Sequence, residues 1–233
     1  RVNGSAISPS GRFVLVSLRE TLPGGENRSH TEIYDTQQKR VIFSEPLSRP
    51  QLNWMPQSDL LTYTADKGER RTLYSLNPLT METVIMAENL PKENFIIAPD
   101  EQSLFYSSKE TLTPGNPGGL KRMIGIDDRQ SHYRDRYYLY RYFLDTGLTQ
   151  QLTFGRQTAS LNDVSNDMRY LLFSVSDEDL TQRPFRSSTL YRLNLETMAT
   201  DTIWKNERYA YSAQFSPDGK QLLIHGAPEA FNG

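Results

Sequence analysis

Residues Phe215-Ser216-Pro217-Asp218-Gly219-Lys220-Gln221-Leu222-Leu223-Ile224 form a polar turn followed by an apolar strand, and this unit decides the fold. In such a turn Pro presets φ, while Gly and Asp tolerate the left-handed conformation of a tight reversal. Similar units occur four more times, at residues 6–16, 54–63, 97–106 and 163–173. Self-similarity along a whole chain indicates a repeat architecture.

A second unit follows each of the first four turns and completes the repeat. It consists of a strand of alternating apolar and polar residues, a polar turn and a return strand. The alternating strands are residues 31–36, 72–77, 138–145 and 189–194, and the return strands are 41–43, 83–85, 151–153 and 201–204. Each repeat is therefore expected to hold four short antiparallel strands, a to d, in two hairpins.

The spacing of the turns tests this interpretation. Turn positions 9, 56, 99, 165 and 217 lie 47, 43, 66 and 52 residues apart. The two longest intervals contain long predicted b–c loops, at residues 109–136 and 177–187, against only 65–70 in the second repeat. Once these loops are shortened to the same length, every interval fits the roughly 40–50 residues of a four-stranded propeller blade.

The sequence thus predicts an all-β fold, an incomplete β-propeller of about four and a half four-stranded antiparallel blades. It is expected to be a single partial propeller over residues 1–233, with blades at about 1–47, 48–90, 91–157 and 158–207 and a half blade at 208–233. The alternative is a β-sandwich with fortuitously similar turns, but a sandwich has no reason to repeat both hairpins in the same order.

The half blade carries a further expectation about association. A sheet edge left open there is ready to pair with another strand. We therefore expect either that the native protein continues past Gly233, or that copies of the chain associate as a homo-oligomer through this edge.

The predicted loops point to one face of the propeller. The a–b turns are short in all five copies, whereas the longest insertions fall on the b–c loops, at residues 19–30, 109–136 and 177–187. All of this material projects from the same end of the blades, and functional residues collect on loops carried by a rigid scaffold. The alternative is neutral insertion, which also accumulates in loops.

The third b–c loop offers candidate recognition residues. Residues 127–136 mix charges and aromatic rings, and the candidates are Arg129, His132, Tyr133, Arg134 and Arg136. They would grip a peptide or pack on a partner domain, or else form a solvated, self-paired charge cluster. Their mixture of Arg and Tyr superficially resembles a nucleic-acid platform. The net charge of −2 argues against nucleic acid as a partner.

A search for catalytic and metal-binding patterns returns no catalytic, cofactor or metal residue. None of the 14 glycines has a Ser two positions later, so the sequence has no G-x-S-x-G nucleophile motif. There is no Cys, and His30, His132 and His225 lie in different repeats without a metal-ligand spacing. No apolar run approaches the roughly 18 residues of a membrane span.

Several of these segments are similar to a known family. Residues 216–224 and 8–11 resemble the repeat of TolB-like propellers and of the N-terminal propeller of prolyl oligopeptidase-family serine peptidases. The resemblance is stronger to the dipeptidyl-peptidase or acylaminoacyl-peptidase type. The segments that indicate this type are residues 138–140, 189–197 and 150–155 (Gln-Gln-Leu-Thr-Phe-Gly). The resemblance covers nearly the whole chain.

The resemblance implies a function that this chain would not perform alone. In that family a propeller lies beside an α/β-hydrolase domain, limits access to short or unstructured peptides and helps to position them. The catalytic Ser, Asp and His match nothing in this sequence, and no Glu-Glu pair is present to hold a substrate amine as in dipeptidyl peptidases. The alternative is a stand-alone TolB-like propeller that binds proteins. Both readings imply a periplasmic or secreted location, with the cytoplasm left open.

Overall fold

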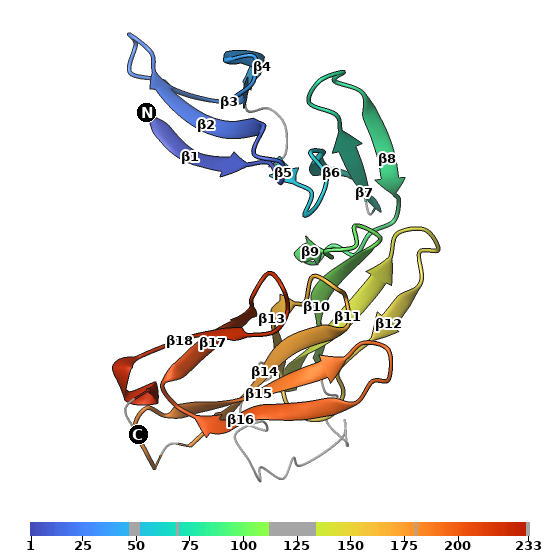
Figure 1. Cartoon of the computed structure of the whole chain (residues 1–233), viewed down its shortest axis with the longest axis vertical. Coiled ribbons are helices and arrows are strands. Elements are labelled where there is room, and N and C mark those ends of the chain that lie inside the picture. Colours follow the sequence, from blue (N-terminus) through green and yellow to red (C-terminus); the bar gives the residue numbers. More distant parts are fainter. Residues whose placement is uncertain (47–51, 69, 112–133, 180, 232–233) are drawn as a thin grey trace, which may run out of the picture. The chain divides into compact units, whose positions relative to one another are not determined.

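The computed structural model describes residues 1–46, 52–68, 70–111, 134–179 and 181–231, and the regular secondary structure of these residues is almost all β-strand (Figure 1). A short 3-10 helix, Pro228–Ala230, follows the last strand, and the described residues contain no α-helix. The strands are β1 Val2–Ile7, β2 Phe13–Thr21, β3 Asn27–Asp35, β4 Arg40–Pro46, β5 Asn53–Trp54, β6 Leu61–Lys67, β7 Arg70–Leu76, β8 Thr83–Ala87, β9 Phe95–Ile97, β10 Ser103–Thr111, β11 Asp135–Phe143, β12 Thr149–Gln151, β13 Ala159–Val164, β14 Tyr170–Glu178, β15 Arg186–Asn194, β16 Thr200–Glu207, β17 Ala210–Phe215 and β18 Leu222–Gly226.

These strands form sheets of one design. Sheets 1 to 4 each contain four strands in sequence order, β1–β4, β5–β8, β9–β12 and β13–β16, and sheet 5 contains β17 and β18. Neighbouring strands within these sheets pair antiparallel, as in β1–β2, β2–β3 and β14–β15. Consecutive four-stranded meanders are the blades of a propeller, so the predicted all-β, incomplete β-propeller fold is confirmed.

The chain forms two compact units. Unit 1 contains residues 1–92 with 143–148, and unit 2 contains residues 93–142 with 149–233. Unit 1 therefore holds sheets 1 and 2. Unit 2 holds sheets 4 and 5 and most of sheet 3.

A serine side chain closes three of the five a–b turns that define the repeat, those that begin at Ser8, Ser165 and Ser216. Ser165 Oγ accepts a hydrogen bond from the Tyr170 N–H at 2.9 Å and donates one to Asp167 Oδ1 at 2.7 Å. Ser216 donates to Asp218 in the same way, at 2.6 Å. The bond from Ser165 is the main reason that the pKa of Asp167 falls to about 2. The recurring Ser, Asp and Gly residues are thus the parts of one hydrogen-bonded reversal.

The fourth position of the turn explains the glycines in this motif. It follows Ser10 in the first copy and an Asp in three others, and it takes a left-handed conformation in all four, with φ of 75° at Gly11, 57° at Glu101, 59° at Met168 and 69° at Gly219. Glycine adopts this conformation without the steric cost that other residues meet. The first and last copies use glycine, which is why their sequences show the motif most clearly.

Aromatic pairs connect strands b and c in three successive sheets. The stacked pairs are Tyr63–Tyr74, Tyr106–Tyr140 and Phe173–Tyr191, with ring centroids 5.0, 5.3 and 5.2 Å apart. Phe173 and Tyr191 face each other directly in the β14–β15 register. Such pairs add to the burial energy of each ring, so the tyrosine-rich c strands of the sequence are structural.

The hydrophobic cores lie between the sheets of each unit. In unit 2 one core joins sheets 3 and 4 through Ala98, Phe105, Leu139, Leu152, Ala159, Val164, Leu171, Phe173, Leu193 and Leu195. A smaller cluster of Leu172, Leu190 and Ala213 joins sheets 4 and 5. In unit 1 the core consists of Phe13, Leu15, Ile33, Leu61 and Leu76. Contact between neighbouring sheets is what buries these side chains, as expected of repeat units.

Polar bonds join neighbouring sheets near the a–b turns. In unit 2 Asp163 Oδ2 accepts the Phe215 N–H at 2.7 Å, and Asn166 Nδ2 donates to the Pro217 carbonyl at 2.9 Å. In unit 1 Asp59 Oδ1 accepts the Ser10 N–H at 3.0 Å. Each bond links residues about 50 positions apart, which is one repeat. We call these bonds the turn clamps.

The prediction that residues 19–30 form a loop was wrong. Strands β2 and β3 continue as a paired hairpin as far as Thr21 and Asn27, which leaves only residues 22–26 unpaired. In sheet 4 the pairing similarly reaches Glu178 and Arg186. The polar residues in these segments suggested loops, but backbone pairing does not require apolar side chains once a hairpin extends past the core.

We predict that Phe173→Ala lowers the free energy of unfolding by about 3–5 kcal/mol, because it removes a buried ring from the core of unit 2. Phe154, which is 70% exposed, provides the matched control, and Phe154→Ala should cost less than about 0.5 kcal/mol. Urea unfolding followed by circular dichroism measures both values. Equal losses from the two variants would contradict the assignment of this core.

A second prediction concerns the turn clamp at Asp163. Asp163→Ala should speed hydrogen exchange at the Phe215 amide, because the half-buried N–H loses its acceptor, whereas Asp163→Asn keeps an oxygen there and should restore slow exchange. Asp201→Ala, which removes an exposed ion pair with Arg192, serves as the control. An unchanged exchange rate in Asp163→Ala would show that the clamp does not hold β17.

Candidate functional site

Three open grooves lie between neighbouring sheets within the units. The first, in unit 1, lies between sheet 1 and the start of sheet 2 and has a volume of about 320 Å³. In unit 2 the groove between sheets 3 and 4 has a volume of about 450 Å³, and the groove between sheets 4 and 5 about 380 Å³. We call these the 1–2, 3–4 and 4–5 grooves. Each one involves the far half of strand b, away from the a–b turn.

The three grooves are equivalent positions of the repeat. Each turn closes through a backbone hydrogen bond between its first and sixth residues, such as Ser8 with Phe13 and Ser165 with Tyr170. Counted from that first residue, Ser17, Ser107 and Ser174 occupy the same position of strand b, and each lines its own groove. Between sheets 1 and 2 and between sheets 4 and 5 the turn clamps lie at the a–b end, and the groove lies farther along strand b.

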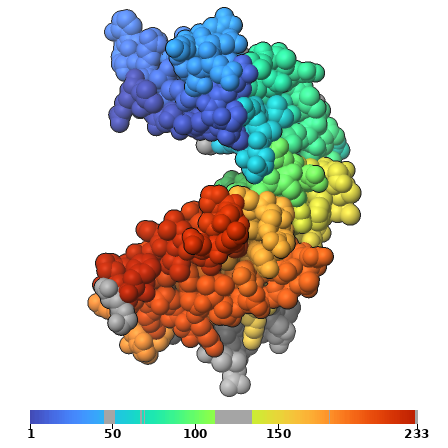
Figure 2. All heavy atoms as spheres, in the orientation of Figure 1, coloured from blue at the N-terminus to red at the C-terminus, as the bar shows by residue number. Residues whose placement is uncertain are grey.

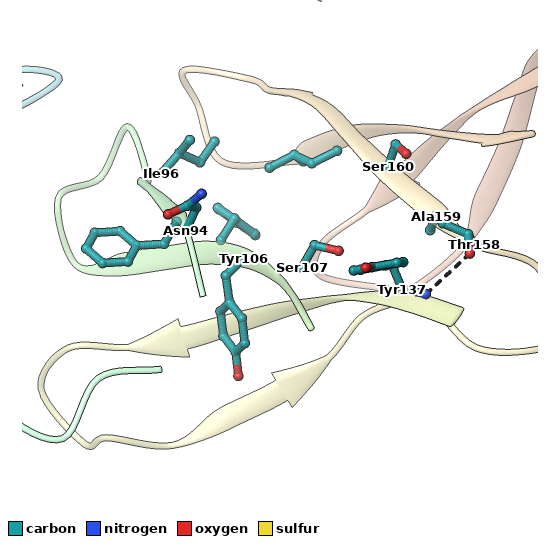
Figure 3. Close-up of a pocket in the computed structure, with 11 residues that line it drawn as sticks. Asn94, Ile96, Tyr106, Ser107, Tyr137, Thr158, Ala159 and Ser160 are labelled. Carbon is teal, nitrogen blue, oxygen red and sulfur yellow. Dashed lines mark hydrogen bonds between the residues drawn. The ribbon is translucent and has the colours of Figure 1, made fainter. Parts of the chain in front are cut away.

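The 3–4 groove combines apolar and uncharged polar side chains from two sheets (Figure 3). In that view Asn94 and Ile96 lie on one side, Thr158, Ala159 and Ser160 on the other, and Ser107 and Tyr137 between them. Its lining residues are Asn94, Phe95, Ile96, Phe105, Tyr106, Ser107, Tyr137, Thr158, Ala159, Ser160 and Leu161.

Polar groups in the 3–4 groove are available to a ligand. The side chains of Asn94, Ser107 and Ser160 make no hydrogen bond within the part of the chain that the structure describes. Thr158 Oγ1 accepts the Tyr137 N–H at 3.4 Å, which ties β11 to the start of sheet 4 (Figure 3). An asparagine side chain offers both a donor and an acceptor, the combination that pairs with a peptide group.

The apolar part of the 3–4 groove has a closed floor and an exposed rim. Phe105 is 1% exposed and belongs to the core below, whereas Ile96 is 46% and Tyr137 is 42% exposed. None of the described residues that line the groove is charged. This combination suits an uncharged extended segment with an apolar side chain. A charged ligand group would lose water on binding without gaining a charged partner, and that loss is costly.

The tyrosines beside the 3–4 groove are suited to packing and hydrogen bonding. Burial raises the pKa of Tyr106, whose ring stacks on Tyr140. Burial, together with its 2.7 Å hydrogen bond to Glu110, also raises the pKa of Tyr140. Both phenols therefore stay protonated at neutral pH and act as hydrogen-bond donors.

Only part of the predicted recognition loop can be compared with this site. Arg129, His132 and Tyr133 lie outside the described residues. Arg136, at the start of β11, donates from Nε to the Arg156 carbonyl, and from Nη1 to the Asp135 carbonyl at 2.9 Å. Arg134 is half-buried, and its Nε and Nη1 are buried without a partner in the described part of the chain. Their role in recognition stays a prediction.

Sequence reasoning missed the groove residues because they lie on strands. Asn94, Ile96 and Tyr137 flank or belong to β9 and β11, and nothing in their local sequence marks a site. The repeat itself could have indicated these grooves, because a serine recurs at one position of strand b, as Ser17, Ser107 and Ser174. A serine repeated on an otherwise apolar strand indicates a surface that is left uncovered.

The histidines have structural surroundings where they are described. His30 lies in β3 with Nε2 at 3.4 Å from Glu32, and the ring of His225 packs edge-on against Tyr211. His132 lies outside the described residues. Within the described ranges no cluster of three or more His, Asp or Glu side chains is arranged to hold a metal ion. No helix in those ranges has the length and apolar character needed to cross a bilayer.

The last sheet exposes apolar side chains. Among the described residues β18 pairs only with β17. Tyr211, Leu223 and Ile224 on these two strands are 60%, 69% and 36% exposed, and Figure 2 shows this sheet, in red, at the surface of unit 2. Association of copies through this edge stays a prediction.

Comparison with known proteins supports the fold. No protein-family model matches the sequence, and no curated protein matches it. The structure is similar to acylaminoacyl peptidase from Pyrococcus horikoshii, with a TM-score of 0.60 and 10% identity over 97% of this chain and 35% of the peptidase. It is also similar to the β-propeller domain of the Trilobed protease from Pyrococcus furiosus, with a TM-score of 0.56 and 10% identity over 97% of this chain and 63% of that one.

A weaker similarity connects the chain with TolB from Acinetobacter baumannii, at a TM-score of 0.46 and 14% identity over 98% of this chain and 55% of that chain. The predicted resemblance to peptidase propellers is thus found at the level of structure. The chain spans about a third of the acylaminoacyl peptidase that it matches.

Proposed function

We propose that this chain is the non-catalytic, peptide-recognising propeller portion of a serine peptidase, and that the 3–4 groove binds part of the peptide. The observation that carries the proposal is the groove itself, whose described lining combines polar side chains without a hydrogen bond to another described residue, an exposed Tyr137 and no charged side chain. Its partners would be a peptide substrate and an α/β-hydrolase domain of the same parent chain.

Two further observations support the proposal. The structural similarity to acylaminoacyl peptidase and to the Trilobed protease propeller brings peptidase function into consideration. The sequence holds no G-x-S-x-G motif of its own, so a hydrolytic nucleophile of that kind would have to be supplied by another domain. The chain would then select and position peptides rather than cleave them.

The proposal keeps the organisation expected from the sequence. The chain would be one partial propeller with blades at about residues 1–47, 48–90, 91–157 and 158–207 and a half blade at 208–233. The propeller would act in the periplasm or outside the cell, as the resemblance implies, and cell fractionation with an antibody against this chain tests that location.

We predict that Tyr137→Ala weakens the binding of short unstructured peptides by about tenfold, because the variant removes an aromatic ring from the rim of the groove. The Tyr137 hydroxyl makes no bond within the described residues, so the variant should keep its fold. Fluorescence anisotropy with labelled hexapeptides measures the affinity, and Phe154→Ala provides an exposed aromatic control. Unchanged affinity in Tyr137→Ala would refute peptide binding in this groove.

The peptidase part of the proposal has its own test. A fluorophosphonate probe that reacts with activated serines should label the protein purified from its natural source, outside residues 1–233. Peptide binding without any labelling would instead favour a stand-alone binding propeller.

A further inference from the structure

The 4–5 groove differs in chemistry from the 3–4 groove. It lies between sheet 4 and the start of sheet 5, and most of its lining is polar or charged. The lining residues are Ser174, Ser176, Pro184, Arg186, Ser187, Ser188, Glu207, Arg208, Ala210 and Tyr211. This groove plays no part in the function proposed above.

Both arginines of the 4–5 groove already have acidic partners. Arg186 Nε lies 3.2 Å from Glu178 Oε1. Arg208 Nη2 lies 3.3 Å from Asp179 Oδ2, and its Nη1 donates to the Pro184 carbonyl. The positive charges at the groove are therefore balanced before any ligand arrives.

Glu207 is the remaining charged residue of the lining. Its Oε1 accepts the N–H groups of Arg208 and Tyr209 at 2.9 and 2.8 Å. Its Oε2 has no hydrogen-bond or ion-pair partner within the described ranges of the chain. Since Glu207 is only half-exposed, the 4–5 groove carries one unbalanced negative charge in a partly desolvated position.

Two serine hydroxyls lie on the same face of sheet 4 as this carboxylate. Ser188 faces Glu207 directly in the β15–β16 register, and its Oγ accepts the Trp204 Nε1–H at 3.4 Å, which leaves a second lone pair. Ser176 faces Ser188 in the β14–β15 register, lines the groove, and makes no side-chain hydrogen bond to any other described residue. An ammonium group donates three hydrogen bonds and accepts none, so a carboxylate oxygen beside hydroxyl oxygens provides the acceptors that it needs.

We propose that the 4–5 groove binds the side-chain ammonium of a lysine in the peptide, with Glu207 Oε2 as the charged acceptor and the hydroxyls of Ser176 and Ser188 as additional acceptors. The proposal adds a second contact to the peptide-binding role above and rests on that role. The 3–4 groove takes an uncharged part of the peptide, and the 4–5 groove selects for a basic side chain.

The test uses two blocked peptides that differ only in lysine or norleucine at one position. Norleucine keeps the length of the apolar stem and lacks the charge, so the ratio of the two affinities isolates the ammonium contact. We expect the protein to bind the lysine peptide about tenfold more tightly, as for one charge-assisted hydrogen bond. We also expect this ratio to shrink as salt is raised.

Glu207→Gln is the decisive variant. Glutamine keeps one oxygen to accept the N–H groups of Arg208 and Tyr209, so the local fold is retained while the negative charge is lost. The ratio of the lysine-peptide affinity to the norleucine-peptide affinity should fall to about one, whereas the affinity for the norleucine peptide should stay unchanged. Glu196→Gln, on the exposed c–d turn of the same sheet, should leave both affinities unchanged.

The possible results separate this inference from the proposed function. Equal affinity for both peptides, or a lysine preference that survives in Glu207→Gln, would overturn the inference alone. A lysine preference that depends on Glu207 but is indifferent to Tyr137→Ala would support the inference and overturn the role of the 3–4 groove. Failure of both peptides to bind would overturn both.

Discussion

The turn clamps are the constraint on which the rest of the structure depends. A carboxylate such as Asp163 accepts a backbone N–H from the next repeat, and this bond fixes neighbouring sheets at their a–b ends. Apolar residues of strands b and c then fill the space behind the clamps between sheets 1 and 2 and between sheets 4 and 5. At both of these junctions a groove lies farther along strand b, away from the clamped end.

The sequence predicted the fold well because the repeat is carried by backbone chemistry. Turns such as 216–219 need residues that tolerate a left-handed φ or accept backbone N–H groups, and few residue types do both. The extent of the hairpin at 19–30 could not be predicted in the same way. Its strands continue into solvent, where pairing does not depend on apolar periodicity.

The candidate site was largely hidden from sequence reasoning. Loop length directed attention to residues 127–136, whereas the described groove is built from strand residues such as Ile96 and Ser160 that meet only when two sheets pack. The sequence also could not predict the negative charge of Glu207 that distinguishes the 4–5 groove. That charge is left without a cationic partner because Arg186 and Arg208 form ion pairs with other carboxylates. A single scaffold thus presents two grooves at equivalent positions with different chemistry.

Peptide binding in the 3–4 groove is tested most directly by amide hydrogen exchange of the protein with and without a bound unstructured peptide. We expect slower exchange at residues 94–96, 105–107 and 158–161, which line the 3–4 groove, and no change at the a–b turns 8–11 and 165–168. Protection confined to the turns, or bound peptide without protection at the groove, would contradict peptide binding at this site.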